Sequence, residues 1–357
     1  CGAGCETAQM FTPLSTERLL LRPARVSDTT ALFERRADPV VSELQDWPMP
    51  YSLERAETQI ERSMASDDPV VDSGWMLTIA DPTDSIIYGD INIFLEDDGR
   101  TSGVGYSITP AYWGRGFASE ALTGVLDWLF DVQDISRAYA MLHPDNHRSA
   151  RVLETCGFVY EGHAKNACWI EDEVSDDLLY GMTPAQRSEW NSRPRTRPST
   201  IELVEPYPTG LRQVITLGTH RSQERMVTPI VISLAQVAVP PYEHGFDGKP
   251  GDPRVVPWPR VIHADGEPVG FVMMQEPTEA NPEPHLWRLL IDRLHQRRGI
   301  GKQVLGAVID QAKAWGSESI TVTWNPGVGS PGPLYLSMGF EPTGEIEDGE
   351  IVARLVL

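Results

Sequence analysis

The stretch Gln296-Arg297-Arg298-Gly299-Ile300-Gly301 decides the fold of the second half of this 357-residue chain. It follows an apolar run at Leu286–Asp292, which is typical of a strand, and it leads into a helical pattern at Ile300–Trp315. Small residues at such a turn let the backbone approach a ligand closely. Unpaired N–H groups and the helix dipole at the start of a helix suit a pyrophosphate. The turn is therefore either an anion site or a solvated basic connection.

The same order of elements occurs in the first half of the chain. There a strand at Gly103–Thr109 precedes the turn Trp113-Gly114-Arg115-Gly116-Phe117-Ala118, and a helix follows at Gly116–Phe130. In both halves a further strand, a short helix and a Gly-Phe pair come next. The last small residue of the turn, Ala118 or Gly301, precedes the Gly of that pair by 39 and 38 residues, respectively. Matched order at matched spacing predicts two copies of one unit.

A polar segment with two prolines separates the two copies. Residues 191–200, Asn-Ser-Arg-Pro-Arg-Thr-Arg-Pro-Ser-Thr, lack apolar periodicity, and proline restricts both itself and the preceding residue, which favours an extended linker. We therefore predict one domain at 14–190 and another at 201–357, both of ordinary domain size. Residues 1–13 are set aside as a tail, because Met10 resembles a start and the residues before it then form a vector remnant or an upstream extension.

The charge of the chain limits the classes of partner. The chain has 30 Lys and Arg against 51 Asp and Glu, a formal net charge of −21, and residues 1–190 hold 14 of the basic and 32 of the acidic residues. Nucleic-acid phosphates and anionic membranes attract basic surfaces, so we expect neither as a partner. The acidity favours an enzyme or binder of neutral or cationic molecules, or it only aids solubility.

Composition also bears on membrane spans, disulfides and metals. No apolar run approaches the roughly 20 residues that span a bilayer, and Cys1–Met10 lacks the basic start and apolar core of a signal peptide. The four cysteines, Cys1, Cys5, Cys156 and Cys168, form neither a disulfide framework nor a zinc-binding pattern. We therefore expect no metal site and a cytoplasmic location.

These motifs resemble those of the GNAT superfamily of N-acetyltransferases over nearly all of both predicted domains. That family's pyrophosphate loop reads Arg/Gln-x-x-Gly-x-Gly/Ala, which the second half matches at Gln296–Gly301. The first half keeps Gly116 and Ala118 but has Trp113 at the leading position, as in the RimJ/RimL-like branch. The second half is similar to bacterial spermidine and polyamine acetyltransferases. Further matching segments are Glu17–Arg22, Gly105-Tyr106, Asn146-x-x-Ser149, Gly157-Phe158, Gln223–Val227, Ser233–Gln236 and Leu286–Asp292.

The resemblance implies an α/β (α+β) fold in each half, with a mixed, mostly antiparallel central sheet flanked by helices. It also implies acetyl-CoA as the cofactor and an amine as the acceptor. The residues implied to bind the cofactor lie on the central strand and the turn of each half, with one more near the short helix of the first half. They are Ile291, Gln296, Arg297, Arg298, Gly299, Ile300, Gly301 and Lys302 in the second half, and Ile108, Trp113, Gly114, Arg115, Gly116, Phe117, Ala118 and Asn146 in the first.

Amine acetylation needs a deprotonated amine, a polarised thioester carbonyl and a proton for the departing thiolate. In the family, backbone N–H groups of the central strand hold the carbonyl, and a tyrosine on the short helix often protonates the thiolate. Tyr335, four residues before Gly339, matches that tyrosine. A tyrosine with a pKa of about 10 is protonated at neutral pH and can donate. Alternatively, Tyr335 packs beneath Phe340 with its hydroxyl in solvent.

The remaining candidate residues each have a structural alternative. The first half has Leu153 where the second has Tyr335, and the RimJ/RimL branch implies Ser149 as the acid instead, unless Ser149 is a helix N-cap. Asn146 either binds CoA or caps the same helix. Glu224 is the candidate base of the second half, acting through a water or attracting a cationic amine, or it is an ordinary exposed carboxylate.

The sequence thus predicts an acetyl-CoA-dependent N-acetyltransferase acting on a primary amine of a small cationic metabolite, an antibiotic or a peptide. The alternatives are acetylation of a protein N-terminus or lysine, and a non-catalytic acyl-CoA-binding module in one half. The complete turn at Gln296–Gly301 together with Tyr335 favours an active second half. The first half is either active on a different amine or a degraded copy. Two fused copies are compatible with both a monomer and a homodimer.

Overall fold

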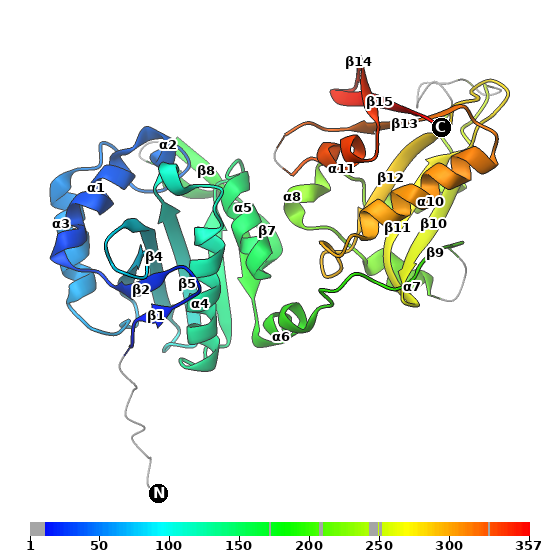
Figure 1. Cartoon of the computed structure of the whole chain (residues 1–357). Coiled ribbons are helices and arrows are strands. Elements are labelled where there is room, and N and C mark those ends of the chain that lie inside the picture. The colour runs from blue at the N-terminus through cyan, green and yellow to red at the C-terminus, as the bar shows by residue number, and fades with distance from the viewer. Residues whose placement is uncertain (1–10, 171–172, 207–209, 243–248, 250–251, 328) are drawn as a thin grey trace, which may run out of the picture. The chain divides into compact units, whose positions relative to one another are not determined.

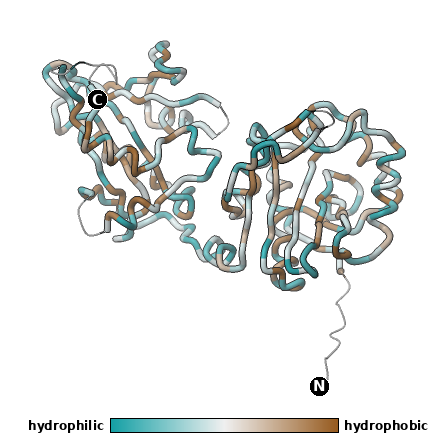
Figure 2. Tube along the Cα trace, turned by 180° about the vertical axis from the view of Figure 1, so that it is seen from behind, coloured by the Kyte–Doolittle hydropathy of each residue, from teal (hydrophilic) through white to brown (hydrophobic). Residues whose placement is uncertain are grey.

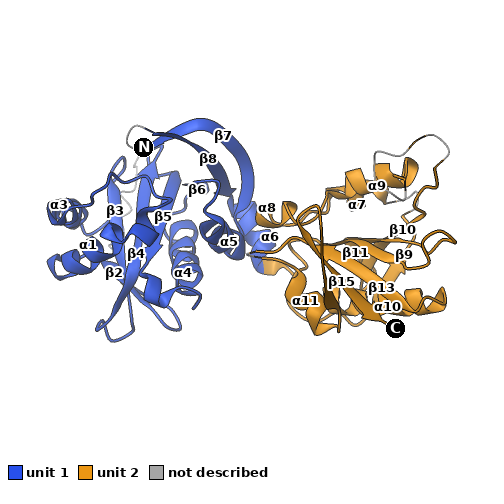
Figure 3. Cartoon of the chain, turned by 90° about the horizontal axis from the view of Figure 1, so that it is seen from above, with its two compact units in different colours: residues 1–191 blue, residues 192–357 orange. Residues whose placement is uncertain are grey.

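The computed structural model describes residues 11–170, 173–206, 210–242, 249, 252–327 and 329–357 (Figure 1). The chain divides into two compact units, Cys1–Asn191 and Ser192–Leu357, which are coloured separately in Figure 3. The limits 14–190, 191–200 and 201–357 inferred from the sequence stay predictions, and residues 1–10 of the predicted tail lie outside the described residues.

Unit 1 is a mixed sheet with helices. Its strands are β1 (Leu14–Ser15), β2 (Leu20–Pro23), β3 (Gly74–Ala80), β4 (Ile87–Glu96), β5 (Thr101–Ile108), β6 (Arg137–Leu142), β7 (Val159–Ile170) and β8 (Glu173–Met182). Its helices are η1 (Val26–Asp28), α1 (Thr29–Ala37), α2 (Pro39–Ser42), α3 (Leu53–Met64), η2 (Pro110–Tyr112), α4 (Phe117–Asp131), α5 (His147–Cys156) and α6 (Pro184–Ser192). The strands form one eight-stranded sheet in the order β1-β2-β3-β4-β5-β6-β8-β7.

Unit 2 has the same kind of architecture. Its strands are β9 (Ile201–Val204), β10 (Pro257–Ala264), β11 (Glu267–Gln275), β12 (His285–Ile291), β13 (Ser319–Trp324), β14 (Glu341–Glu347) and β15 (Glu350–Val356). Its helices are α7 (Leu211–Thr216), α8 (Arg221–Glu224), α9 (Ile230–Ala238), α10 (Ile300–Ala314) and α11 (Gly332–Ser337). The sheet order is β14-β15-β13-β12-β11-β10-β9.

The two sheets share one topology. From β2 onward the first sheet runs β2-β3-β4-β5-β6-β8-β7, and the second runs β9-β10-β11-β12-β13-β15-β14. Within the described residues each sheet has one parallel pair, β5 with β6 and β12 with β13, while the other neighbouring pairs are antiparallel. This arrangement confirms the predicted mixed, mostly antiparallel sheet in both halves.

The parallel pair of each sheet is short. In unit 2, β12 and β13 pair only where His285 faces Thr321 and Leu286 faces Val322 in the described ladder. On the other side of β12, Leu286 faces Met274 and Arg288 faces Met273, so that Trp287 is an extra residue in the strand. Such a β-bulge bends the strand and redirects its side chains. The two strands therefore part beyond Leu286, as β5 and β6 do beyond Gly103.

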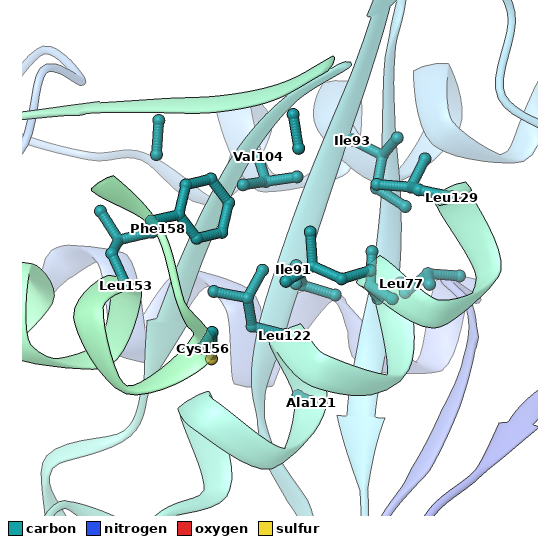
Figure 4. Close-up of a cluster of buried hydrophobic side chains, with 14 of the residues drawn as sticks. Leu77, Ile91, Ile93, Val104, Ala121, Leu122, Leu129, Leu153, Cys156 and Phe158 are labelled. Carbon is teal, nitrogen blue, oxygen red and sulfur yellow. The ribbon is translucent and has the colours of Figure 1, made fainter. Parts of the chain in front are cut away.

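A long helix packs against the sheet of each unit and fixes the turn before it. In α4, Leu122 and Leu129 are buried and lie close to Ile91 and Ile93 of β4 (Figure 4). Apolar residues recur at helical spacing on that face, which is why this segment forms a buried helix. Figure 2 shows the resulting alternation of hydrophobic and hydrophilic stretches along the chain. The helix predicted from the sequence is thus observed, beginning one residue after Gly116.

Membrane, thiol and metal features complete the description. None of the helices in the described ranges is long and apolar enough to cross a bilayer. Cys156 and Cys168 are free thiols, and Cys1 and Cys5 lie outside the described residues. In the same ranges no three His, Cys, Asp or Glu side chains are grouped as metal ligands.

Candidate active site

A cleft of ≈ 370 Å³ lies in unit 2 where β12 and β13 part. This volume is in the range of small-molecule sites. The cleft brings together predicted site residues that are as much as 111 positions apart in sequence, since Glu224 and Tyr335 both line it. The predicted cofactor-binding residues on its wall are Ile291, Gln296, Arg297, Gly299, Ile300 and Gly301.

The turn at the edge of this cleft has a backbone conformation that both units share. Arg297 and Gly299 have φ of 63° and 75°, and Gly114 and Gly116 have φ of 74° and 80° at the corresponding positions of unit 1. Left-handed residues alternating with ordinary ones turn successive N–H groups to one side, where they can bind an anion. Neither α10 nor α4 has a side-chain N-cap bond, so the first helical N–H groups remain available.

Gln296 in unit 2 and Trp113 in unit 1 make equivalent hydrogen bonds to the end of the central strand. The Gln296 side chain donates from Nε2 to the carbonyl oxygen of Ile291 at 3.0 Å. Trp113 donates from Nε1 to the carbonyl oxygen of Ile108, also five residues earlier, at 2.6 Å. Both bonds tie the end of the central strand to the turn. The tryptophan that departs from the family pattern therefore keeps the bond that the glutamine makes.

Two of the predicted basic residues do not reach the cleft of unit 2. Arg298 is buried, and its Nε donates to the carbonyl oxygen of Thr196 at 2.8 Å while Nη1 lies 3.0 Å from His295 Nδ1. Its side chain thus fastens the segment before β9 to the turn. Lys302 is exposed on α10 and does not line the cleft. Binding of the cofactor by these two side chains stays a prediction without support from the geometry.

Tyr335 lies in the wall of the cleft with its ring held by aromatic neighbours. Its ring centroid is 5.6 Å from that of Trp324 and 6.0 Å from that of Phe340. The side chain is 5 % exposed, and its hydroxyl has no hydrogen-bond partner in the described part of the chain. Burial, followed by the charge of Glu350, raises the pKa of Tyr335 above its ordinary value. The hydroxyl is therefore protonated and free to donate into the cleft.

Glu224 lines the same cleft but already has a partner. Its carboxylate pairs with Arg221, three residues earlier on α8. The side chain is 41 % exposed at this pair. A role as base requires the carboxylate to leave Arg221 or to share it, so the geometry agrees with the exposed-carboxylate alternative as well as with the base.

Unit 1 has a cavity of ≈ 300 Å³ where β5 and β6 part, and Ser149 and Asn146 line it. Asn146 Oδ1 accepts a hydrogen bond from the backbone N–H of Ser149 at 3.1 Å, so Asn146 is the N-cap of α5. Ser149 therefore sits one turn inside the helix rather than at the cap. The turn residues 113–118 do not line this cavity.

Tyr106 is a site residue to which the sequence assigned no role. Its hydroxyl lies 2.9 Å from Ser149 Oγ and 3.0 Å from the Ser149 carbonyl oxygen, inside the cavity of unit 1. Burial raises the pKa of Tyr106, so that the hydroxyl stays protonated. Leu153, which replaces the tyrosine of unit 2, is fully buried in the core. The matched pair Gly105-Tyr106 was the available signal, since it places a tyrosine on the strand that leads to the turn.

Strand β12 begins with a histidine that resists protonation. His285 Nδ1 lies 2.9 Å from Thr321 Oγ1, and burial, followed by the charge of Arg288, lowers the pKa of His285 to about 4. Burial and Arg293 likewise lower the pKa of His220 to about 4. An unfolded histidine titrates near pH 6.5. Between pH 6.5 and 4 the unfolded chain therefore binds more protons, and stability falls as the pH falls.

We expect unit 2 to lose about 1–2 kcal/mol of its free energy of unfolding for each of these histidines between pH 7 and pH 5. Hydrogen–deuterium exchange of β12 and β13 peptides as a function of pH measures this loss. His285→Gln should flatten the dependence, and His263→Gln, a change at a half-buried residue of β10, should leave it intact. A wild-type protein whose exchange protection is constant from pH 7 to pH 5 would contradict the expectation.

Two family matches account for both units. The family described as "Acetyltransferase (GNAT) domain" matches residues 18–159, and "Acetyltransferase (GNAT) family" matches residues 236–340. The chain belongs to the GNAT family. It is an N-acetyltransferase with two GNAT domains in tandem.

Individual relatives of this GNAT protein are single-domain in length. The chain is 31% identical over 174 residues to the uncharacterized N-acetyltransferase YoaA of Bacillus subtilis (strain 168), covering 48% of this chain and 97% of the relative. It is 27% identical to the [ribosomal protein uS5]-alanine N-acetyltransferase of Escherichia coli (strain K12), covering 48% and 90%. The crystal structure of spermidine N-acetyltransferase from Vibrio cholerae in complex with CoA and spermine is 18% identical, with a TM-score of 0.42, over 48% and 99%.

Proposed function

We propose that this chain transfers the acetyl group of acetyl-CoA to a primary amine and that unit 2 holds the complete set of groups for the reaction. One observation carries the proposal: the turn at residues 296–301, the unpaired edge of β12 and the hydroxyl of Tyr335 converge on one cleft. Acetyl-CoA supplies the activated acetyl thioester.

The wall of the cleft fits the diphosphate of that donor. The N–H groups at the start of α10 carry the positive end of the helix dipole. Arg297 lines the cleft beside them and adds a full positive charge. At Gly301 there is little room beside the backbone, since an added Cβ would lie 3.3 Å from Leu334 Cδ2. A charged or bulky side chain at this position would fill the space that the phosphates need.

The chemistry requires the protein to move one proton. The amine nitrogen bonds to the acetyl carbon and the carbon–sulfur bond breaks, while the amine loses a proton and the sulfur gains one. We assign Tyr335 as the donor of that proton, because its hydroxyl is protonated and has no hydrogen-bond partner within the described residues. Backbone N–H groups of β12, where β13 no longer pairs with it, are available to polarise the carbonyl oxygen.

Unit 1 has a distinct acceptor chemistry that favours a second activity. Asp46 and Asp177 line its cavity, and neither carboxylate has a hydrogen bond or ion pair within the described residues. Burial, followed by the charge of Asp46, raises the pKa of Asp177. An ammonium group placed between them would relieve this repulsion. We therefore assign the small cationic amine to unit 1, with Ser149 and Tyr106 as its candidate proton donors.

The subtype of each unit, the identity of its acceptor, the location and the oligomeric state are proposed with less support. The RimJ/RimL-like subtype of unit 1 has support from the relative named for acetylating a ribosomal-protein alanine, so a protein N-terminus is the alternative acceptor there. The polyamine-acetyltransferase-like subtype of unit 2, an antibiotic or peptide as acceptor, a cytoplasmic location, and a monomer or homodimer stay predictions from the sequence.

Gly301→Glu tests the proposed function directly. A carboxylate at the start of α10 should repel the diphosphate, and we expect CoA affinity at unit 2 to fall at least about 100-fold. Isothermal titration with CoA should then show one binding site per chain fewer than the wild type. Gly306→Glu makes the same change in the same helix, outside the cleft, and should retain every site.

The corresponding variant Ala118→Glu applies the same test to unit 1. An unchanged number of CoA sites in Gly301→Glu would overturn the assignment of the donor site. Loss of a site in Gly306→Glu would show that the effect comes from the helix and not from the cleft.

A further inference from the structure

An arginine of β12 lines the unit 2 cleft. Arg288 lies on β12 directly after the bulge at Trp287, and it lines the cleft together with Tyr335 and Glu350. Its Nη1 donates to the carbonyl oxygen of Trp287 at 2.7 Å, and its guanidinium carbon lies 5.2 Å from the centroid of the Trp287 ring. These contacts hold the guanidinium in one place.

The other edge of this guanidinium has no partner. Nε of Arg288 is buried without a hydrogen bond, and no hydrogen bond or ion pair engages Nη2 within the described residues. Burial lowers the pKa of Arg288, against the opposing charge of Glu350. A guanidinium that is partly withdrawn from water and has no anion beside it is destabilised. Nη2 is left to donate a charged hydrogen bond to an oxygen of a carboxylate or phosphate.

The carboxylates that line the cleft make no ion pair with Arg288 within the described residues. Glu350 Oε1 accepts a hydrogen bond from Asn325 Nδ2 at 2.8 Å. Glu224 pairs with Arg221. Neither makes an ion pair with Arg288, although both line the cleft. The free edge of the arginine is thus left for a group that enters from outside.

Unit 1 lacks this feature. Arg288 precedes Ile291 by three residues, and Gly105 precedes Ile108 by three residues in the matching strand. The cavity of unit 1 instead presents the unpaired carboxylates Asp46 and Asp177. The two clefts therefore differ in the charge that they offer to an acceptor.

We propose that the amine accepted by unit 2 carries an oxyanion, a carboxylate or a phosphate, and that Arg288 binds this group through Nη2. The proposal rests on the acetyl-transfer function proposed above and names its acceptor class. Glu350, which lines the same cleft, offers a carboxylate to the ammonium of the same acceptor. Amino acids and phosphorylated amino alcohols have this combination of charges.

Matched pairs of acceptors test the proposal on the full chain. The pairs are leucine with leucinamide and O-phosphoethanolamine with ethanolamine, and spermidine serves as an amine without an oxyanion. The Ala118→Glu background silences unit 1, so that CoA release reports unit 2. We expect kcat/KM to be at least about tenfold higher for one oxyanion-bearing member than for its neutral partner. The pair that shows the preference identifies carboxylate or phosphate as the group bound.

Arg288→Gln should remove this preference, mainly through a 10- to 100-fold rise in KM, about that expected for a lost charged hydrogen-bond pair. Arg260→Gln is the matched control, because Arg260 also lies over a tryptophan and donates from Nη1 to the preceding carbonyl, but outside the cleft. It should leave the preference intact.

Four outcomes would overturn the proposal, the last of them together with the proposed function. The first is equal turnover of both members of both pairs, and the second is a preference that survives Arg288→Gln. The third is turnover of spermidine or the neutral amines alone, which would overturn the oxyanion class but leave acetyl transfer standing. CoA release with none of the five amines would overturn the proposed function of unit 2 as well.

Discussion

Tyr335→Phe should lower kcat of unit 2 by about 10²- to 10⁴-fold, the usual contribution of a positioned proton donor. The ring would stay in place, because Trp324 and Phe340 pack against it without using the hydroxyl. The mutation removes only the hydroxyl, a protonated donor that makes no hydrogen bond to another group in the described part of the cleft. The sulfur must then take its proton from water, so the effect belongs to bond breaking rather than to binding.

The measurement is steady-state CoA release in the Ala118→Glu background, together with CoA titration. We expect KM and CoA affinity to stay within about twofold of the parent while kcat falls. Tyr242→Phe removes a hydroxyl from the same unit outside the cleft and should change neither value. A kcat for Tyr335→Phe within twofold of the parent would exclude the tyrosine as the acid and favour direct protonation by solvent.

The two copies of one domain could be predicted from the sequence, because the helical spacing of apolar residues and the order of the elements agree in both halves. The helix α10 begins directly after Gly299, and its apolar residues lie at helical spacing, as in α4. The turn residues and Tyr335 then converge in unit 2 because both line the cleft where β12 and β13 part. The glycine positions, the strand–helix order and the short helix were all readable without the structure.

Other elements had no readable signal. The α9 sequence Ile-Val-Ile-Ser-Leu-Ala-Gln-Val-Ala is apolar on nearly every side, so no period indicates a helix. The β14 sequence Glu-Pro-Thr-Gly-Glu-Ile-Glu is exposed throughout and contains a proline and a glycine. It is a strand because it pairs with β15. Tertiary contacts, rather than intrinsic preference, decide such segments.

The position of Arg288 in the wall of the cleft could not be predicted from the sequence. Strict alternation along β12 would put Leu286 and Leu290 on one face of the sheet. The structure puts Leu286 in the core under α10 and Leu290 in the cluster on the other face, since Trp287 is an extra residue between them. A β-bulge leaves no mark in a run such as Leu-Trp-Arg-Leu-Leu-Ile. The side of the sheet to which Arg288 belongs could therefore be assigned only from the pairing of β12 with β11.

In unit 1, Asp90→Ala should lower the free energy of unfolding by about 3–5 kcal/mol, because the mutation leaves two buried arginines without their anion. Asp90 is 1% exposed, and its carboxylate accepts hydrogen bonds from Arg35, Arg36 and Ser107. Burial opposes its ionisation, but the two guanidinium groups outweigh burial and hold the pKa of Asp90 below its ordinary value. The carboxylate is thus an anion that the fold requires.

Glu161→Ala is the control, because Glu161 also binds an arginine, Arg137, but at a site where both side chains are about 30% exposed. Solvent screens that pair, and its loss should cost at most about 1 kcal/mol. Hydrogen–deuterium exchange of unit 1 peptides under increasing urea separates the two variants. An equal loss of exchange protection in the two variants would mean that burial does not make the ion pairs of Asp90 more stabilising than the exposed pair of Glu161.

The same carboxylate sets the behaviour of unit 1 in acid. Because the folded pKa of Asp90 lies below the unfolded value of about 3.9, its contribution is complete above that pH and is lost as the pH falls through the folded pKa. Unit 1 should therefore keep the protection that Asp90 provides down to about pH 4.

Asp90 also lines the cavity of unit 1, where Arg36 and Asn92 contact its carboxylate. Its arginine pairs therefore fix part of the cavity wall that the acceptor of that unit would contact. Asp90→Ala should thus weaken acetyl transfer by unit 1 at temperatures where the fold still holds, and an Asp90→Ala protein with wild-type turnover would confine the role of Asp90 to stability.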